Sequence, residues 1–308
     1  MRQLPRMHLA KEKGMSGRKE AEVASREIVY RPFSLRDIAA ARALSSELRW
    51  PHRVEDWQLV AQAGRGFVAQ DGGGTVVGTG LCWKYGSDCA SLGMVIVSPQ
   101  HQGRGIGRKL MELLLEELGE RTVILHATRE GQPLYKKLGF EAIGTIHQHQ
   151  GTAFQPPLVS LPQGERLRPL GSNDTARLTE LASRASGLDR GELMPALLEV
   201  SEGIALARDG DLIGFALFRR FGHGFAIGPV VASESDDSCR AKALISYWLA
   251  LNAGAFVRID TPDECRLSEW LEGLGLAHAG TVVKMARNGA LPADASVRQF
   301  GIVNQAVC

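Results

Sequence analysis

The chain has 308 residues, a length that accommodates two domains of ordinary size. Hydrophobic residues make up 44% and charged residues 23%, as in a soluble globular protein, and no apolar run is long enough to span a bilayer. The first 26 residues hold seven Lys and Arg against three Asp and Glu, whereas the remainder holds 29 against 31. A nearly neutral body with 6% aromatic residues lacks the basic surface that nucleic acid requires. We therefore expect neither nucleic acid nor a membrane as a partner.

Residues 1–26 are expected to form a disordered leader, because they contain no apolar core of the secretory type. A start codon assigned too early, with Met7 or Met15 as the true start, is another interpretation. A transit peptide is a third, although three glutamates in the leader argue against it. The five cysteines show no CxxC or metal spacing, which favours free thiols, a cytoplasmic location and no metal site.

The sequence pattern of residues 27–154 predicts one α/β unit. Its expected elements are a strand at 28–32, helices at 35–48 and 54–63, and strands at 66–70, 75–85 and 89–97, followed by a helix at 108–118 and a strand at 121–128. Gly-rich turns such as 71–74 separate the strands as hairpins. The pattern indicates a mixed, mostly antiparallel sheet flanked by helices.

The segment 102–107, Gln-Gly-Arg-Gly-Ile-Gly, lies between the apolar run 94–97 and the helix at 108–118. Its glycines allow backbone N–H groups to converge, and the helix adds its positive N-terminal end, so the segment predicts a phosphate or pyrophosphate site. A P-loop would need a hydroxyl after the lysine, which Arg108-Lys109 does not provide. A dinucleotide fingerprint would need one more residue between the last two glycines.

The pattern Q/R-x-x-G-x-G/A resembles the pyrophosphate loop of the GNAT N-acyltransferases, which bind acetyl-CoA. The segment 134–140, Leu-Tyr-Lys-Lys-Leu-Gly-Phe, is similar to the L-Y-x-x-x-G-F segment of the same family. The resemblance covers residues 28–150 and implies that the parallel strands 89–97 and 121–126 splay apart to admit the pantetheine arm. One departure is Thr128, where many members have Asn.

The resemblance also implies which backbone groups hold acetyl-CoA: the strand before the loop pairs with the pantetheine amides, and the loop binds the pyrophosphate. The expected residues are Met94, Val95, Val97, Gln102, Gly103, Arg104, Gly105, Ile106, Gly107 and Arg108. The two arginines of this set are equally well explained as solvated surface residues. No metal or further cofactor is implied.

Tyr135 stands at the family's position for the general acid, which protonates the leaving thiolate; the alternative is a tyrosine of the core. His126 ends a strand beside the expected splay and is a candidate base, although a core histidine explains it equally well. His147 and His149 share one face of a strand and are better explained as surface residues than as metal ligands. Other candidate bases are Glu55, Asp56 and Asp88.

The second half of the chain repeats the first at an offset of 134 to 137 residues. Arg31 and Asp37, for example, match Arg168 and Asp174. We therefore predict an α/β (α+β) chain of two tandem GNAT-like domains, at 27–154 and 165–289. A Pro-rich linker at 155–164 separates them, and a C-terminal tail follows at 290–308.

The second copy differs from the first at the residues that are expected to bind CoA and to take part in catalysis. When the copies are aligned on Val97 and Val231, Cys239 takes the place of Gly105, and Leu271 replaces Tyr135 when they are aligned on the Leu-Gly-Phe segment. The other loop replacements are Asp236, Asp237 and Ala241, for Gln102, Gly103 and Gly107. Acidic side chains repel a pyrophosphate, and the loss of glycine removes the close backbone approach. We predict that only the first copy binds CoA.

The segment 50–57 combines two tryptophans, a histidine and two acids, and either covers the acceptor site or forms a capped helix start. If the copies face each other, acids of the second copy could receive a cationic amine. The candidate acceptor residues are Trp50, His52, Asp56, Trp57, Asp189 and Asp260.

These patterns predict an acetyl-CoA-dependent N-acetyltransferase that acts on a primary amine of a small molecule. The alternative is a non-catalytic acyl-CoA sensor or partner-binding protein. Retention of Tyr135 favours the enzyme, because a sensor needs no acid. Acetylation of proteins is a third possibility, and a second copy that covers the acceptor groove argues against it.

Overall fold

The computed structural model describes residues 27–233 and 236–308, and the leader predicted for 1–26 lies outside these ranges. The elements of the first copy alternate as the sequence predicts. They are β1 (Val29–Pro32), α2 (Ile38–Glu47), α3 (Val54–Ala63), β2 (Arg65–Gln70), β3 (Val76–Tyr85), β4 (Cys89–Val97), α4 (Ile106–Leu118), β5 (Thr122–Ala127), α5 (Gln132–Lys137) and β6 (Glu141–Thr152).

The second copy repeats this order and adds one strand. Its elements are β7 (Glu165–Pro169), α6 (Thr175–Ser186), α7 (Leu193–Glu199), β8 (Glu202–Arg208), β9 (Asp211–Phe221), β10 (Gly224–Ser233), α8 (Cys239–Leu251), β11 (Phe256–Pro262), α9 (Ser268–Gly273), β12 (Ala277–Arg287) and β13 (Val297–Gly301). No helix in the described ranges is both long and apolar enough to cross a membrane.

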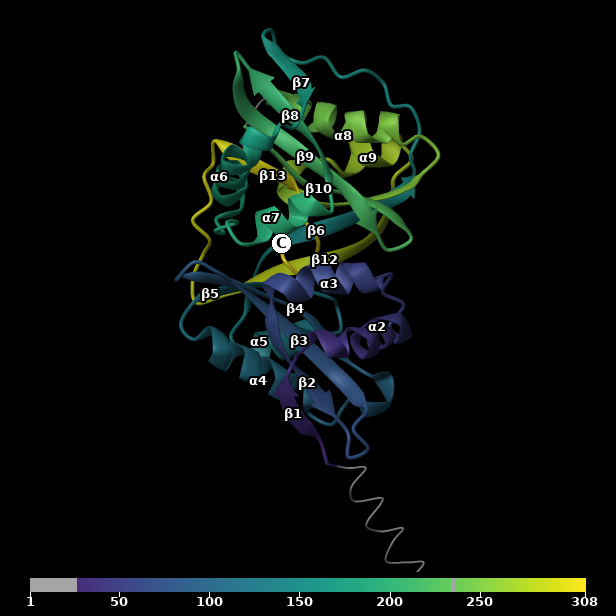
Figure 1. Cartoon of the computed structure of the whole chain (residues 1–308), viewed down its shortest axis with the longest axis vertical. Coiled ribbons are helices and arrows are strands. Elements are labelled where there is room, and N and C mark those ends of the chain that lie inside the picture. Colours follow the sequence, from purple (N-terminus) through teal and green to yellow (C-terminus); the bar gives the residue numbers. More distant parts are fainter. Residues whose placement is uncertain (1–26, 234–235) are drawn as a thin grey trace, which may run out of the picture.

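Within the described ranges, the strands form one 13-stranded sheet in the order β1-β2-β3-β4-β5-β12-β6-β11-β10-β9-β8-β7, with β13 added on β10. The sheet runs through both copies, as Figure 1 shows. Its parallel pairs among these strands are β4–β5 and β10–β11. The predicted α/β class, with a mixed and mostly antiparallel sheet flanked by helices, is confirmed.

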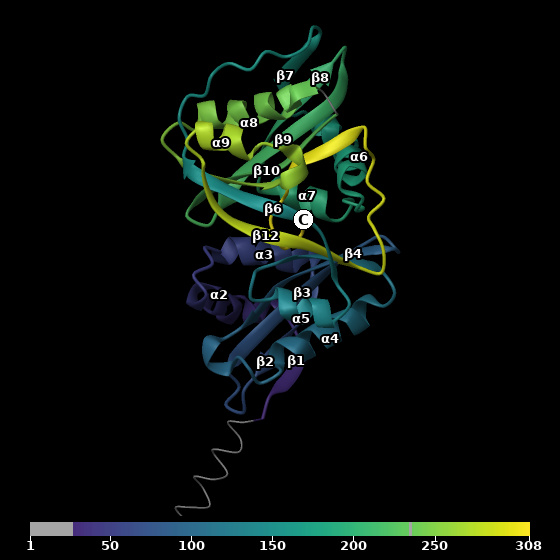
Figure 2. The ribbon, with the colours of Figure 1, turned by 180° about the vertical axis from the view of Figure 1, so that it is seen from behind.

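The two copies exchange their last strands. β12 of the second copy pairs with β5 of the first, with Val283 opposite Ala127, and β6 of the first pairs with β11 of the second, with Gln148 opposite Asp260. Because β6 and β12 also pair with each other, they cross the middle of the molecule side by side in Figures 1 and 2. The linker at 155–164 therefore separates the copies in sequence, while the sheet joins them in space.

The helices cover both faces of the sheet, and those on one face lie between the two copies. In α4, Leu110, Leu114 and Leu118 recur at helical spacing and pack on one face of the first copy. On the other face, α2 and α3 share a core with α6 and α7 of the second copy, which includes Trp57 and Leu197. That shared face is the junction of the two copies.

Residues 290–308, predicted as a tail, are instead part of the fold. β13 pairs antiparallel with β10, with Gln299 opposite Val231, because β11 leaves that end of β10 unpaired. Residues 302–308, which we call the junction segment, then pass between the copies, and Val307 is only 1% exposed. Figure 1 shows the chain end at the junction, between α3, α7 and β12.

Candidate active site

The two parallel strands of the first copy part where the resemblance predicts. β4 and β5 pair from Cys89 to Leu92, and beyond Leu92 the pairing with β5 ends. A bulge follows, because the register between β3 and β4 shifts there and Met94 adopts a left-handed φ of 53°. The Thr79 hydroxyl donates to the Met94 carbonyl oxygen at 2.9 Å and fixes this bulge. The β5 side of β4 is therefore open to an extended ligand that pairs as a strand would.

The loop after β4 has the backbone of an anion site. Gly103 and Gly105 have φ of 76° and 79°, and α4 begins at the next residue, Ile106. The N–H groups of Gly103, Gly105, Ile106 and Gly107 donate to no backbone carbonyl within the described ranges. A Cβ atom at Gly103 or Gly105 would meet nothing within 4 Å, so the space above the loop is open. These features fit the phosphates of a CoA molecule.

The polar side chains of this loop have different surroundings. The Gln102 amide donates to the Val97 carbonyl at 3.1 Å and closes the loop against β4. Arg108 lies 66% exposed and pairs with Glu112 one turn later, with 2.9 Å between Nε and Oε1. Such a surface pair contributes little to stability. The structure thus places Arg108 beside the loop while its guanidinium is held along α4.

Tyr135 lies on α5 and packs its ring edge-on against Phe140, with 6.1 Å between the ring centres. Burial raises the pKa of the phenol to about 12. The hydroxyl has no hydrogen-bond partner among residues 27–233 and 236–308. A phenol that keeps its proton at neutral pH and has no other acceptor is in the state that a proton donor requires.

His126 is the penultimate residue of β5 and lies on the face that the two copies share. Its Nδ1 lies 3.0 Å from the carbonyl oxygen of Gln305, and since a carbonyl can only accept, Nδ1 carries the hydrogen and Nε2 the lone pair. Burial lowers the pKa of His126 to about 4, and the Lys284 charge acts in the same direction. The imidazole is therefore neutral at physiological pH.

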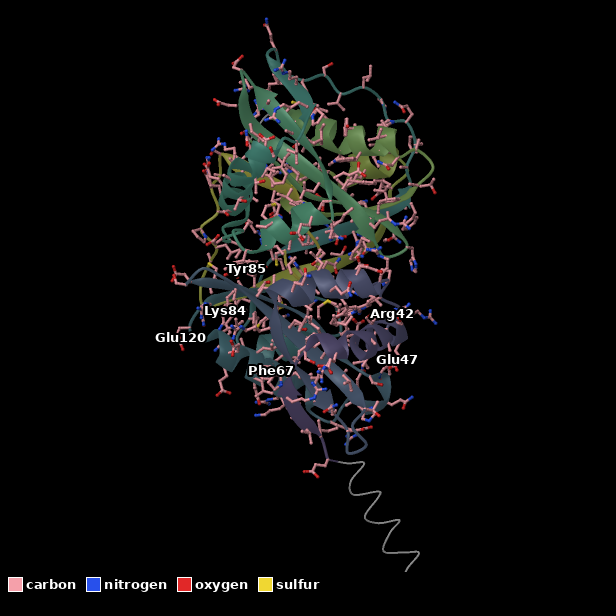
Figure 3. The ribbon with its side chains drawn as sticks, in the orientation of Figure 1. Arg42, Glu47, Phe67, Lys84, Tyr85 and Glu120 are labelled. Carbon is pink, nitrogen blue, oxygen red and sulfur yellow. The ribbon has the colours of Figure 1, made fainter. Side chains whose placement is uncertain are left out.

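The junction segment lies against the splay on the same face as His126. The Val307 carbonyl accepts from Tyr85 at 2.9 Å and from Arg190 at 2.7 Å, and the Ala306 carbonyl accepts from Ser91 at 3.2 Å. Figure 3 labels Tyr85 at this junction. A Cβ on Gly93 of β4 would stand 2.8 Å from the Ala306 Cα, so the approach requires glycine.

Sequence reasoning did not predict this contact. Its one local signal is a glycine inside a strand, at position 93, which can mark the close approach of another backbone. The main-chain carbonyls of the junction segment leave no trace in the sequence. Arg190, which is 2% exposed and lies over the Tyr85 ring, carried no recognisable motif.

Two residues of the segment 50–57 have structural roles. Trp57 is completely buried and donates its indole N–H to Ser45 at 3.2 Å. Asp56 accepts from the backbone N–H of Arg53 at 2.9 Å, which caps α3, and from that of Gly222 at 3.0 Å. The helix-start interpretation thus accounts for both, and Asp56 also ties the segment to the β9–β10 turn of the second copy.

The other two acceptor candidates of that segment are Trp50 and His52. The His52 ring packs edge-on against Trp50 and, 5.7 Å away, against Phe221 of the second copy. Burial lowers the pKa of His52 to about 4, so this ring is neutral. The structure therefore brings His52, like Asp56, into contact with the second copy.

The two acids of the second copy do not offer a free carboxylate to an amine at the splay. Asp260 is 4% exposed and accepts two hydrogen bonds from Arg258, at 2.9 and 2.6 Å. Asp189 is exposed and lies beside Gly86 in the β3–β4 turn, at the end of β4 away from the loop. The expectation that these acids receive a cationic amine is therefore not supported.

The second copy has lost the open site in two ways. β13 occupies the edge of β10 at Val230 to Ser233, where the first copy leaves β4 open. α8 begins at Cys239, so Ser238, with φ of 54°, stands at the place of Gly105. The alignment that put Cys239 there is wrong by one residue, because the second loop is one residue shorter.

The histidines of β6 are bound by polar neighbours. His147 Nε2 lies 3.0 Å from an Asp263 carboxylate oxygen, and His149 Nε2 lies 3.1 Å from the Ser268 hydroxyl. Across residues 27–233 and 236–308, no group of three or more His, Cys, Asp or Glu side chains is arranged to hold a metal ion.

Comparisons with known proteins agree with this architecture. Residues 33–140 match the model of the acetyltransferase (GNAT) family, and residues 178–301 match that of an acetyltransferase (GNAT) domain. The chain is 32% identical over 225 residues to YitH, an uncharacterized N-acetyltransferase of Bacillus subtilis, covering 72% of this chain and 77% of that protein.

Solved structures share the fold. A crystal structure from Pyrococcus horikoshii, described as that of an acetyltransferase, superposes with a TM-score of 0.73 at 21% identity and covers 91% of this chain and 96% of its own. A tandem GNAT protein from the clavulanic acid biosynthesis pathway superposes with a TM-score of 0.61 at 16% identity, covering 86% and 99%. The chain therefore belongs to the GNAT family of acetyltransferases, as an acyltransferase built from two tandem GNAT domains.

Proposed function

We propose that the protein is an acetyl-CoA-dependent N-acetyltransferase that transfers the acyl group to a primary amine of a small molecule. One contrast between the copies carries this proposal. The first copy keeps an open β4 edge and a glycine loop, whereas β13 fills the same edge of the second copy. One acyl-CoA site per chain follows, and Tyr135 lies in the copy that keeps it.

The proposed chemistry needs little from the protein beyond binding and proton transfer. Acetyl-CoA supplies an activated thioester. The N–H groups of Gly103 and Gly105 bind phosphate oxygens, and the open edge of β4 pairs with the amides of the arm. Tyr135 donates its proton to the leaving sulfur, for which the phenol is available because it stays protonated at neutral pH.

The amine must reach the splay without its proton. His126 has a lone pair on Nε2, so it can accept a proton from the amine, directly or through a water molecule. With a pKa of about 4 it gives that proton up again readily, so it serves as a relay rather than a store. The Gln305 carbonyl keeps the ring in the tautomer that this role requires.

The test is release of free thiol from acetyl-CoA in the presence of amines, amino acids, aminosugars and polyamines. We expect turnover with at least one of these classes, and product masses increased by one acetyl group. Gly105→Val should lower kcat/KM for acetyl-CoA at least tenfold with all of them, because a β-branched residue is strained at its φ of 79° and its side chain occupies the open space above the loop. Thiol release that does not depend on any amine would contradict the proposal.

One observation favours the alternative, a non-catalytic acyl-CoA sensor. The junction segment already covers the acceptor face of the splay, with the Ala306 backbone against Gly93. The cavity next to it, lined by residues that include Phe221 and Asn304, holds about 10 Å³. Tight binding of acetyl-CoA without turnover of any amine would support the sensor.

A further inference from the structure

Arg219, on β9, is a buried cation at the junction of the two copies. It is 3% exposed, and no carboxylate of the described residues lies within 4.0 Å of its guanidinium. Its Nη2 donates to the Val303 carbonyl at 2.9 Å, while its Nε has no hydrogen-bond partner in the same ranges. The guanidinium also lies 5.1 Å from the centre of the Phe221 ring.

The neighbouring acids, Asp56 and Asp260, attract Arg219 from a distance, but each forms its ion pair with another arginine. Arg53 binds Asp56 at 2.9 Å. Arg258 binds Asp260 at 2.6 Å and lies over the same Phe221 ring. Burial lowers the pKa of Arg219 to about 10, so it remains charged at neutral pH. A buried charge without a close counter-ion is costly, and buried charges in proteins are normally paired, so the missing partner of Arg219 points to an anionic ligand.

A second unpartnered polar atom lies in the same cluster. The Nδ1 of His52 is shielded from solvent and has no hydrogen-bond partner among the described residues. His52 and Arg219 contact the same Phe221 ring. Phe221 and Val303, which both contact Arg219, line a cavity of about 10 Å³ together with Arg258 and Asp260, and this cavity has room for about one water molecule.

We propose that Arg219 binds a carboxylate group of the acceptor, so that the acceptor is an amine that also carries a carboxylate, as an amino acid does. This inference rests on the proposed acetyltransferase function. In the described conformation the Val303 carbonyl, a neutral acceptor, occupies the position on Nη2 that the carboxylate takes. Because the cavity is so small, the carboxylate enters only when residues 303–304 move aside.

The spacing of two carbonyl groups along the junction segment is short enough for one small molecule to contact both Arg219 and His126. Arg219 binds the carbonyl of Val303, and His126 binds that of Gln305, two residues further on. Two residues of extended chain span at most roughly 7 Å. An acceptor whose carboxylate lies at Arg219 can therefore place an amine near His126 at the splay.

The first experiment compares acceptors in pairs that differ by the carboxylate: phenylalanine with phenethylamine, ornithine with putrescine, and serine with ethanolamine. We expect a higher kcat/KM for the acids. In Arg219→Met this preference should fall about 10- to 100-fold, the effect of losing a charged hydrogen bond. Arg220→Met is the control, since Arg220 is the next residue, is exposed and lies over Phe225. A preference that is the same in Arg219→Met as in the wild type would overturn the proposal.

The second experiment needs no turnover, so it separates this proposal from the proposed function. Millimolar phenylalanine, ornithine or serine should raise the Tm of the wild type and increase hydrogen exchange in residues 302–304, and should do neither in Arg219→Met. Without these compounds, Arg219→Met should be at least as stable as the wild type, because it removes an uncompensated buried charge. A lower Tm for this variant, together with no response of the wild type to the acids, would identify a structural arginine. If the acids bind but no amine is acetylated, the acetyltransferase function fails and the carboxylate site stands.

Discussion

His126 donates its Nδ1 hydrogen to the carbonyl oxygen of Gln305 across 3.0 Å, although the two residues belong to different copies of the fold. His126 lies near the end of β5 of the first copy, and Gln305 follows β13, the last strand of the second. The second copy thus reaches the edge of the splay through its backbone. If the proposed function is right, the second copy, whose own strand edge is filled by β13, forms one wall of the site in the first copy.

The glycine at position 105 should be necessary for CoA binding. Valine there has to adopt a φ near 79°, which costs about 1–2 kcal/mol, and its side chain occupies the open space above the loop. We expect the Kd for CoA to rise at least tenfold, measured by calorimetry. Gly210→Val is the matched control, because Gly210 also has a left-handed φ (96°) and open space, but lies in the second copy. Equal CoA affinities for both variants would count against the loop assignment.

Tyr135→Phe should separate binding from chemistry. Removal of the hydroxyl leaves the ring packed on Phe140, so the affinity for acetyl-CoA should be kept. Turnover should fall by about 10² to 10⁴, the usual contribution of a positioned acid. Steady-state kinetics and calorimetry measure the two quantities, with Tyr247→Phe on α8 as the control. Unchanged turnover, with the chemical step shown to limit the rate, would mean that Tyr135 is a structural residue of the core.

Titration should find one CoA site in each chain. The β10 edge that would receive a second pantetheine arm is paired with β13. In the second loop Ser238 stands at the place of Gly105, and Asp237 beside it also has a left-handed φ. Calorimetry with CoA should give a stoichiometry of one. Two equivalent sites would require β13 to leave its strand position and would contradict the division of roles between the copies.

Acid should destabilise the protein through its buried histidines. The pKa values of His52 and His126 are about 4 in the folded chain, below the ordinary value near 6.5, so the unfolded chain binds more protons between these limits. Stability should be full above pH 6.5 and fall as the pH drops toward 4, by up to roughly 3 kcal/mol for each residue.

Melting temperatures at pH 7 and pH 5 test this dependence. His52→Asn and His126→Asn should each flatten it, whereas His223→Asn, at an exposed position, should leave it unchanged. If neither buried variant alters the difference between the two temperatures, these histidines are not the groups that titrate.

The first copy should not fold as a monomer by itself. A fragment that ends at Pro157 contains β5 and β6 but lacks β12, which lies between them in the sheet. Unpaired strand edges favour association, and β6 of a second fragment can take the place of β12, because β6 and β12 are equivalent strands of the repeat. Light scattering should therefore show a dimer or aggregates. A stable monomeric fragment that binds CoA would show that the strand exchange is dispensable.

Much of the first copy was readable from local patterns. The glycines at 103 and 105 have the left-handed φ that only glycine adopts without strain, and the helix that follows has its apolar residues at helical spacing. The predicted splay lies where the pairing of β4 with β5 ends at Leu92. Family, fold class and acyltransferase activity were predicted from these segments and are confirmed. The roles of single residues, such as Tyr135, stay predictions.

What the sequence by itself determined is therefore the set of local conformations: which residues can form a strand, a helix or an anion-binding turn, and that this set occurs twice. Only the tertiary structure decided that β6 and β12 change places, that β13 closes the second site, and that residues 302–308 lie on the first. The physical reason is that strands pair through backbone hydrogen bonds, which form with almost any side chain. The sequence therefore does not reveal which strands pair when they lie more than a hundred residues apart. The environment of Arg219 could not be predicted either, since its contacts with Val303 and Phe221 arise only in the tertiary structure.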